Sequence, residues 1–309
     1  MGEDAIRIER TQNIWSSFSR KFEPVARATQ LEPDPQLAQS EIGGLAAAKD
    51  EILTYACAAT DPAVYGRWGT YPPSGLLLIG RRGVGKSLLA RSLATLTRSS
   101  FIVVAVPRLV LEVIHEGGKI GELVAAWSQT LSEIAPSTIL FDELEFSQAH
   151  EIGARRPDLP VGPVMDFLLD IVDRTVAADS HLVVGSTNHP ETLRRAFLQP
   201  GRFERVVEVT PAYPEDIVEA LVLHSAASEK RAGHALFDDV DWKSVVERLR
   251  EPATSEWIRI MHAVLRRKAR REASGETATK VTTQDMLEEV DRFRQASNQI
   301  AVPHAGNYV

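Results

Sequence analysis

Cysteine is almost missing from this sequence, since Cys57 is the single one among 309 residues. One thiol cannot form an internal disulfide or a cysteine-cluster metal site, which excludes a disulfide-stapled scaffold and fits a reducing compartment. Long apolar runs are also missing. The longest, such as Gly75–Gly80 and Phe101–Pro107, are far shorter than the roughly 20 residues of a membrane-spanning helix. The N-terminus has no signal-like apolar stretch, and we therefore expect a cytoplasmic protein with no membrane span.

Basic residues are too few to give this chain a positive net charge. Lys and Arg number 35 against 42 Asp and Glu, a formal charge of −7, so nucleic acid is not expected as a partner of the whole molecule. The motif His-Glu-x-x-His is absent, which excludes a metallopeptidase of that type. Hydrophobic residues make up 44% and charged residues 25%, which excludes intrinsic disorder and collagen-like repeats.

Between residues 41 and 212, short apolar runs rich in branched residues alternate with helical periodicity. Such an alternation predicts a parallel sheet with helices on both faces, and ligands then bind at the carboxyl ends of the strands. The predicted strands are Leu76–Ile79, Phe101–Val106, Thr138–Phe141, Leu182–Gly185 and Val206–Thr210. The predicted helices between them include Lys86–Thr97, Gly121–Ile134 and Val164–Val176.

The flanks of this region have a different character. Residues 213–295 lack strand patterns and are expected to form a small all-helical domain, and residues 296–309 an irregular tail. The predicted helices of the segment 213–295 are Glu215–Ser228, Trp242–Arg250, Ser255–Arg271 and Thr283–Gln295. Residues 1–40 form a separate polar segment with one short helical pattern, at Ile14, Trp15, Phe18, Phe22 and Val25. That helix either packs on its own domain or docks a partner or adaptor protein.

The strongest local signal is Gly80–Ser87, which satisfies the pattern G-x-x-x-x-G-K-[ST] between a predicted strand and a predicted helix. Its glycines let the backbone curl so that successive N–H groups point at phosphate oxygens, and the helix N-terminus adds a positive end. Lys86 can then reach the β and γ phosphates of a nucleotide, and the Ser87 hydroxyl can bind Mg²⁺. The segment therefore predicts a site for a nucleoside triphosphate.

Two further strands end in polar residues that suit the same chemistry. Asp142 and Glu143 follow the apolar run Thr138–Phe141, where an uncompensated carboxylate would be costly. Asp142 can hold Mg²⁺ through water, and Glu143 can orient and deprotonate the attacking water. Asn188 follows the strand Leu182–Gly185. If that strand lies beside the one that precedes the phosphate loop, the Asn188 amide can contact the γ-phosphate or the attacking water.

With these motifs in order, the stretch from about Glu41 to Phe293 resembles the AAA family of hexameric ATPases. Besides the phosphate loop and the acid pair, Leu193–Glu208 is similar to the family's second region of homology. The resemblance implies a P-loop NTPase fold, with a five-stranded parallel sheet, helices on both faces and a helical lid domain. It also implies that Mg·ATP is bound and hydrolysed between the subunits of a homo-oligomeric, hexameric ring.

The same resemblance assigns further residues. Arg202 and Arg205 match the arginine fingers, which project into the neighbouring subunit's site and stabilise charge on the transferred phosphoryl group. Ile42 and Gly43 lie in a segment whose backbone contacts adenine, and His224 matches a lid residue that contacts the nucleoside. The nucleotide-contacting residues implied by the resemblance are Ile42, Gly43, Gly80, Gly83, Val84, Gly85, Lys86, Ser87, Leu88 and His224.

Some positions depart from the family's pattern. Arg81 and Arg82 stand where the family usually has two prolines, which makes the phosphate loop more flexible and adds positive charge near the nucleotide. The stretch Glu112–Gly118 aligns with the loop that grips a polypeptide in the central pore, and Val113 occupies its aromatic position. An aliphatic side chain has less area for that contact, which places the threading of an extended polypeptide in doubt.

The sequence therefore predicts an ATPase that remodels or disassembles a protein target, contacted through the N-terminal segment or the pore loop. A second hypothesis is a nucleotide-gated scaffold or regulatory subunit with slow hydrolysis. A third is a clamp or loader on nucleic acid, which depends on the basic run Arg266–Arg271. That run alternatively complements the negative end of its helix. The C-terminal Tyr308 resembles the docking tails of proteasome-activating ATPases.

Overall fold

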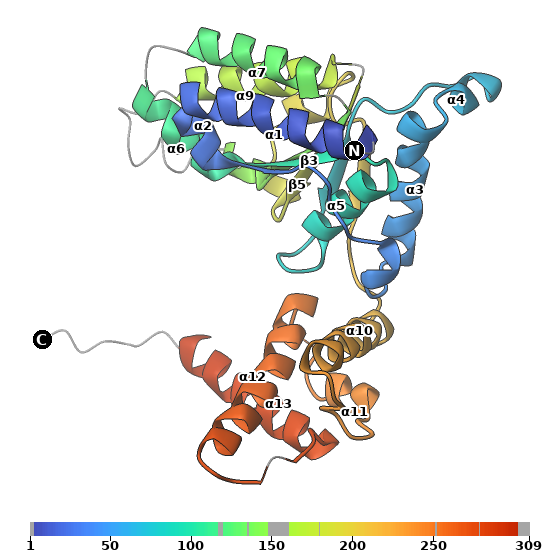
Figure 1. Cartoon of the computed structure of the whole chain (residues 1–309), viewed down its shortest axis with the longest axis vertical. Coiled ribbons are helices and arrows are strands. Elements are labelled where there is room, and N and C mark those ends of the chain that lie inside the picture. Colours follow the sequence, from blue (N-terminus) through green and yellow to red (C-terminus); the bar gives the residue numbers. More distant parts are fainter. Residues whose placement is uncertain are drawn as a thin grey trace, which may run out of the picture. The chain divides into compact units, whose positions relative to one another are not determined.

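A computed structural model describes residues 3–116, 120–134, 136–147, 161–178, 180–250, 252–277 and 279–301, and its ribbon is drawn in Figure 1. The chain divides into two compact units. The first, here called the α/β unit, consists of Met1–Gln39, Ala46–Arg81 and Lys86–Val209. The second, the helical unit, consists of Ser40–Leu45, Arg82–Gly85 and Thr210–Val309.

A six-stranded sheet in the order β1-β3-β4-β5-β2-β6 forms the centre of the α/β unit. Five of its strands are mutually parallel, as the sequence predicts for a P-loop NTPase fold. Their continuous apolar stretches suit a sheet that is covered on both faces. These strands are β2 (Leu76–Ile79), β3 (Ser100–Ala105), β4 (Ser137–Asp142), β5 (His181–Thr187) and β6 (Arg205–Glu208).

A sixth strand, β1 (Thr29–Glu32), adds an edge to the five parallel strands that were expected. It pairs antiparallel with β3 at the edge of the sheet, with Leu31 opposite Ile102. Only Leu31 is apolar among its four residues, so the segment has no strand pattern of its own. Its strand conformation depends on the backbone hydrogen bonds that the edge of β3 offers.

Residues 3–39 of the segment that was predicted to be separate belong to the α/β unit. They form α1 (Glu3–Lys21) and α2 (Glu23–Ala28) before β1. Phe18, Phe22 and Val25 are buried in the main apolar core. The Trp15 ring packs edge-on against Trp127, with ring centroids 6.2 Å apart. Of the two alternatives for this helix, the structure adopts packing on its own domain.

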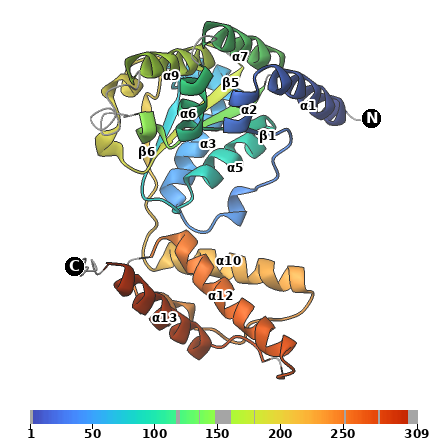
Figure 2. The ribbon, with the colours of Figure 1, turned by 90° about the vertical axis from the view of Figure 1, so that its left-hand side faces the viewer.

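Helices cover both faces of the sheet, as Figure 2 shows. On one face lie α3 (Ala46–Thr60) and α5 (Lys86–Leu96). On the other lie α6 (Val106–Glu116), α7 (Ile120–Ile134) and α9 (Val161–Val176). The short helix α4 (Ala63–Arg67) follows α3. Trp127 of α7 is fully buried and its Nε1 donates to Thr175 Oγ1 of α9 at 3.0 Å, which ties these two helices together.

The helical unit is built from α10 (Glu215–Ala232), α11 (Trp242–Glu247), α12 (Thr254–Ala273) and α13 (Thr283–Ala301). Its core includes Leu221, Trp257 and Met286, which are fully buried. Helix α11 begins after Asp241, whose side chain accepts a hydrogen bond from the Ser244 N–H at 3.0 Å, a regular N-cap. None of the helices in the described ranges is long and apolar enough to cross a membrane.

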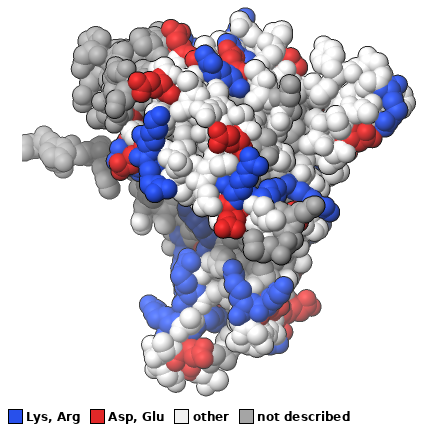
Figure 3. Space-filling view, turned by 45° about the horizontal axis from the view of Figure 1, so that its top comes forward, with Lys and Arg blue, Asp and Glu red and all other residues white. Residues whose placement is uncertain are grey.

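The basic run Arg266–Arg271 lies in the second half of α12, and two of its members pair with acids of α13. Arg267 contacts Glu289, and Lys268 Nζ lies 2.7 Å from Asp285 Oδ2. On the face that Figure 3 shows, acidic side chains lie close to basic ones on both units. The ion pairs engage two members of the run within the helical unit itself.

Candidate functional site

The phosphate loop connects the end of β2 to the start of α5. Gly83 and Gly85 have φ angles of 81° and 113°, a left-handed region in which side chains other than glycine are strained. These turns let the loop curl back, and α5 begins at Lys86. Val84 is buried, whereas Ser87 and Leu88 are exposed at the N-terminus of α5. An exposed hydroxyl at that end of a helix is accessible to a metal ion.

Lys86 is 6% exposed, and its ammonium group makes three hydrogen bonds. Nζ donates to Gly80 O at 2.7 Å, to Arg81 O at 2.9 Å and to Asn188 Oδ1 at 2.9 Å. An ammonium has three donors, so the group is saturated. Burial lowers the pKa of Lys86, and the nearby carboxylates of Asp142, Glu145 and Glu143 oppose that effect.

Asp142 at the end of β4 and Glu143 just after it lie near this lysine because β4 neighbours β5 and β5 neighbours β2. Ser186 Oγ donates to Asp142 Oδ1, and the backbone N–H of Glu143 donates to the same hydroxyl at 3.3 Å. Glu143 has a φ of 60°, which is uncommon and strained for a residue with a side chain. The chain therefore turns sharply directly after the strand.

The donor set at this edge suits Mg²⁺. The described residues contain no group of three His, Cys, Asp or Glu side chains that could hold a metal by themselves. Magnesium is usually held by one or two carboxylates, with water and substrate phosphates completing its octahedron. Ser87 and Asp142 would supply the protein's share, and the ion would neutralise charge on the phosphates.

Asn188 stands between Lys86 and a residue that the sequence analysis missed, Glu145. The Asn188 Nδ2 donates to Glu145 Oε1 at 2.7 Å, and its backbone N–H donates to the same oxygen at 3.2 Å. The signal for Glu145 was available, since it is a third acid just past the pair at the end of β4. Nothing in the local sequence identified Asn188 as its partner.

The two arginines, Arg202 and Arg205, lie at the opposite end of the sheet from the phosphate loop of their own chain. Strands β2 and β6 are parallel, and Arg205 pairs with Leu76, the first residue of β2. The phosphate loop follows Ile79, the last residue of β2, about 10 Å further along the strand. The parallel register therefore separates these arginines from the loop within one chain.

Each of these arginines is paired within its own chain. Arg202 Nε and Nη2 lie 2.5 and 2.8 Å from the two carboxylate oxygens of Asp173 in α9. Arg205 Nε donates to Glu51 Oε2 of α3 at 2.9 Å, and a second contact joins the two groups. The Arg202 side chain is 16% exposed and that of Arg205 is 54% exposed, so Arg205 is the more accessible of the two.

The residues expected to contact the adenine and the nucleoside lie in the helical unit. Ile42 is buried, and a Cβ on Gly43 would come within 2.4 Å of the Ala220 backbone in α10. The Leu45 N–H donates to Asp216 Oδ2 at 2.9 Å, which fastens the same segment to α10. His224 lies further along α10, and burial lowers its pKa. Its imidazole is therefore neutral near pH 7.

The first part of the stretch expected to form a pore loop, Glu112–Glu116, lies in helix α6, and Val113 is a helical residue. Helix α6 continues to Glu116, and Val113 is 3% exposed within the main apolar core. Glu112 lies 3.0 Å from Arg27 of α2. Gly117 and Gly118 lie outside the described residues. The amphipathic period of α6 turns Val113 inward, so its side chain packs in the core and is not exposed. Tyr308 also lies outside the described residues.

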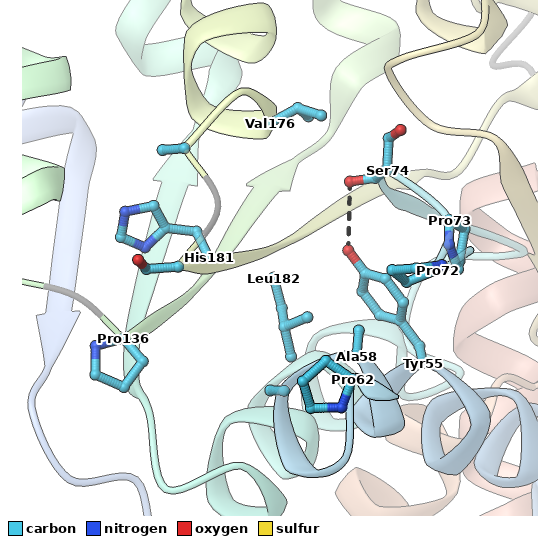
Figure 4. A pocket seen from close by; sticks show the side chains of 13 residues that line it. Tyr55, Ala58, Pro62, Pro72, Pro73, Ser74, Pro136, Val176, His181 and Leu182 are labelled. Atoms are coloured by element: carbon cyan, nitrogen blue, oxygen red, sulfur yellow. Dashed lines mark hydrogen bonds between the residues drawn. The ribbon is translucent and has the colours of Figure 1, made fainter. Parts of the chain in front are cut away.

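A cavity of about 650 Å³ lies at the amino ends of β2, β4 and β5 in the α/β unit, away from the phosphate loop. Figure 4 shows its lining, which includes four prolines, Pro62, Pro72, Pro73 and Pro136. The Tyr55 hydroxyl contacts Ser74 O at 3.5 Å and accepts the Val183 N–H at 3.1 Å. Tyr55 is therefore already hydrogen-bonded and helps to close the sheet end.

Comparisons with known proteins show which family and which proteins this chain is similar to. Residues 76–211 match a family model described as ATPase family associated with various cellular activities (AAA). The chain is 30% identical to a proteasome-activating nucleotidase of Archaeoglobus fulgidus over 294 residues, or 94% of this chain and 70% of that protein. It is 33% identical to the protein of the same name from Methanocaldococcus jannaschii over 207 residues, 65% of this chain and 46% of that protein.

A eukaryotic protein is similar as well. The 26S proteasome regulatory subunit 4 homolog of Dictyostelium discoideum is 28% identical over 215 residues, which cover 67% of this chain and 47% of that protein. The chain thus spans about half the length of two of these three relatives. The matched family segment ends at residue 211, close to Thr210, from which the rest of the chain belongs to the helical unit.

Proposed function

Because the chain belongs to the AAA family of ATPases and is an ATP-hydrolysing enzyme, we propose that its sites lie at the interfaces of a ring of identical chains. Each site would bind Mg·ATP, and each hydrolysis event would drive a change in a bound protein. Six chains is the ring size that the family resemblance favours. The relatives are named proteasome-activating nucleotidases, which favours a protein as the target.

The residues at the carboxyl edge of the sheet divide the chemistry among them. The loop amides and Lys86 bind the phosphates, and Ser87 and Asp142 hold Mg²⁺. Glu143 accepts the proton of the attacking water, while Asn188 orients that water or reports on the γ-phosphate. When bound, Mg²⁺ neutralises charge on the β and γ phosphates. Within the helical unit, Ile42, Gly43 and His224 would contact the base and nucleoside.

The parallel pairing of Arg205 with Leu76 carries the proposal of a shared site. A guanidinium at the amino end of β6 cannot reach phosphates at the carboxyl end of β2 in the same chain. It can reach those of an adjoining chain whose carboxyl edge faces it. Arginine supplied from a neighbour stabilises the transition state of phosphoryl transfer, so hydrolysis would require assembly.

Replacing Glu143 by Gln tests this function. The amide cannot accept a proton from water but fills the same space, so we expect ATP to be bound with unchanged affinity and hydrolysis to fall at least about 100-fold. Glu272→Gln, at an exposed position of α12, serves as the matched control. Hydrolysis by Glu143→Gln at the wild-type rate would show that another group is the base, and failure of the wild-type protein to hydrolyse ATP would refute the function itself.

One observation favours a second function, a nucleotide-gated scaffold with slow hydrolysis. The residue at the expected gripping position, Val113, is buried, and a ring that does not grip a polypeptide gains little from fast turnover. A candidate protein target distinguishes the two functions. A remodelling ATPase hydrolyses ATP several-fold faster when its target is added, whereas a scaffold changes its assembly state with nucleotide and keeps the same rate.

A further inference from the structure

We propose that Glu145 is a positioning residue that sets which end of the Asn188 amide faces the phosphates. It holds the NH₂ group away from them, so that Asn188 presents its oxygen to Lys86 and to the attacking water. Asn188 would then accept a hydrogen bond at the reaction centre rather than donate one to the γ-phosphate. This inference rests on the proposed ATPase function and assigns a role to a residue outside the expected catalytic set.

The chemistry of the two neighbours determines the orientation of the amide. Lys86 Nζ lies 2.9 Å from one end of the Asn188 amide, and Glu145 Oε1 lies 2.7 Å from the other. An ammonium only donates hydrogen bonds and a carboxylate only accepts them. The reverse orientation would place two donors together and two acceptors together. Only the arrangement with Oδ1 toward Lys86 satisfies both contacts.

The backbone positions Glu145 for this task. It lies in the short 3-10 turn η2 (Leu144–Ser147) that follows β4, and Asn188 follows β5, the neighbouring strand. Leu144 is buried in the core, and a Cβ added to Gly185 of β5 would come within 2.6 Å of its Cδ1. This close approach fixes the turn against β5 next to Asn188.

Glu145 Oε1 accepts two hydrogen bonds from one residue, the side-chain and backbone amides of Asn188. The pair of contacts restrains rotation of the Asn188 side chain. The second oxygen, Oε2, is buried without a hydrogen-bond partner among the described residues. A buried acceptor in that state is unfavourable for stability, and a residue selected for packing alone would not carry it.

The orientation has a consequence for the reaction. An amide oxygen repels the anionic γ-phosphate but attracts the hydrogens of a water molecule and the ammonium of Lys86. When a phosphate binds the ammonium of Lys86, a phosphate oxygen must replace at least one of the three present hydrogen-bond acceptors. The oxygen of Asn188 then becomes available to accept from the attacking water, whose other proton passes to Glu143.

A pair of compensating substitutions tests the orientation. Asn188→Asp places two carboxylates against each other, so we expect kcat for ATP hydrolysis to fall at least about 30-fold. In the double variant Asn188→Asp with Glu145→Gln, the new amide NH₂ donates to one aspartate oxygen and leaves the other toward Lys86. We expect the double variant to recover at least about ten-fold in kcat over Asn188→Asp alone.

The opposite outcome overturns the inference. If Asn188 must donate to the γ-phosphate, an aspartate cannot do so in either variant, and the double variant stays as slow as Asn188→Asp. Thermal unfolding of all variants identifies any that fail to fold.

A further variant, Glu145→Ala, tests the inference even if the Asn188 variants fail to fold. For Glu145→Ala we expect kcat to fall about ten-fold, because the amide loses its restraint. The affinity for a non-hydrolysable ATP analogue should stay within about three-fold of wild type, because the residue does not bind the nucleotide. Wild-type kcat in Glu145→Ala would refute the inference alone, whereas an inactive wild-type protein would refute the ATPase function.

Discussion

Arg202 and Asp173 form a two-point ion pair within one chain, with Nε–Oδ1 and Nη2–Oδ2 distances of 2.5 and 2.8 Å. A third contact, from Arg202 Nη1 to Ala196 O at 2.5 Å, completes the restraint. The planar guanidinium and the carboxylate match each other in shape, which fixes the direction of the arginine more firmly than a single contact would. Nε, Nη1 and Nη2 of Arg202 are therefore all engaged within its own chain.

Arg202→Ala should abolish most hydrolysis without abolishing ATP binding. An arginine that stabilises the transferred phosphoryl group from a neighbour contributes about 10³-fold or more to kcat, so we expect a loss of that order. Arg174→Ala is the matched control, because Arg174 directly follows Asp173, is exposed, and pairs with Asp170 at 2.9 Å. Its activity should stay within about two-fold of wild type.

Mixing two inactive variants tests whether the arginine acts in the site of a neighbouring chain. Arg202→Ala supplies intact phosphate loops and Glu143→Gln supplies intact arginines, so a mixture of the two inactive proteins should regain activity through hybrid interfaces. A mixture as inactive as its components would place the arginine's effect within its own chain.

His181 should make stability depend on pH between about 4 and 6.5. Burial lowers its pKa to about 4, and its Nδ1 lies 2.8 Å from Ser137 Oγ. The unfolded chain, in which a histidine pKa is about 6.5, takes up the proton first as the pH falls. The folded state therefore loses stability through this window, by at most about 3 kcal/mol.

Urea unfolding at pH 4.5 and 7 measures this effect. We expect His181→Gln to show a smaller loss of unfolding free energy between the two pH values than wild type, because it removes the buried titrating group. His189→Gln, which alters an exposed histidine, should behave like wild type. Equal losses in all three proteins would assign the acid sensitivity to other groups, such as His224 and His262, whose pKa values burial also lowers.

Gly43→Ala should destabilise the helical unit. The new Cβ would lie 2.4 Å from the backbone N and Cα of Ala220, and backbone atoms cannot rotate away as a side chain can. We expect a loss of about 1–3 kcal/mol, together with faster hydrogen exchange of the α10 amides. Gly121→Ala is the control, since nothing lies within 4 Å of its added Cβ, and in a helix it should be neutral or slightly stabilising. Equal stability of the two variants would contradict the close packing.

Local features were predictable from the sequence. The run Leu76–Ile79, the phosphate loop and the helix from Lys86 follow one another in the chain, and each has a signal within its own residues. The same holds for the acids at the end of β4, for Asn188 after β5 and for the helices of the helical unit. A continuous apolar strand or a glycine-rich loop specifies its conformation mainly through short-range sterics and burial, so these elements and their polar ends could be read directly.

Other features depended on partners that are distant in the chain. β1 is a strand because β3 offers it an edge, Val113 faces the core because α6 continues past it, and Glu145 matters because β4 lies beside β5. The separation of Arg205 from its own phosphate loop follows from the parallel register of β6 and β2. The sequence by itself determined a nucleotide-binding α/β protein with a helical C-terminal region. Which side chains meet was decided by the strand order and register, because these set the distances between residues that no local pattern connects.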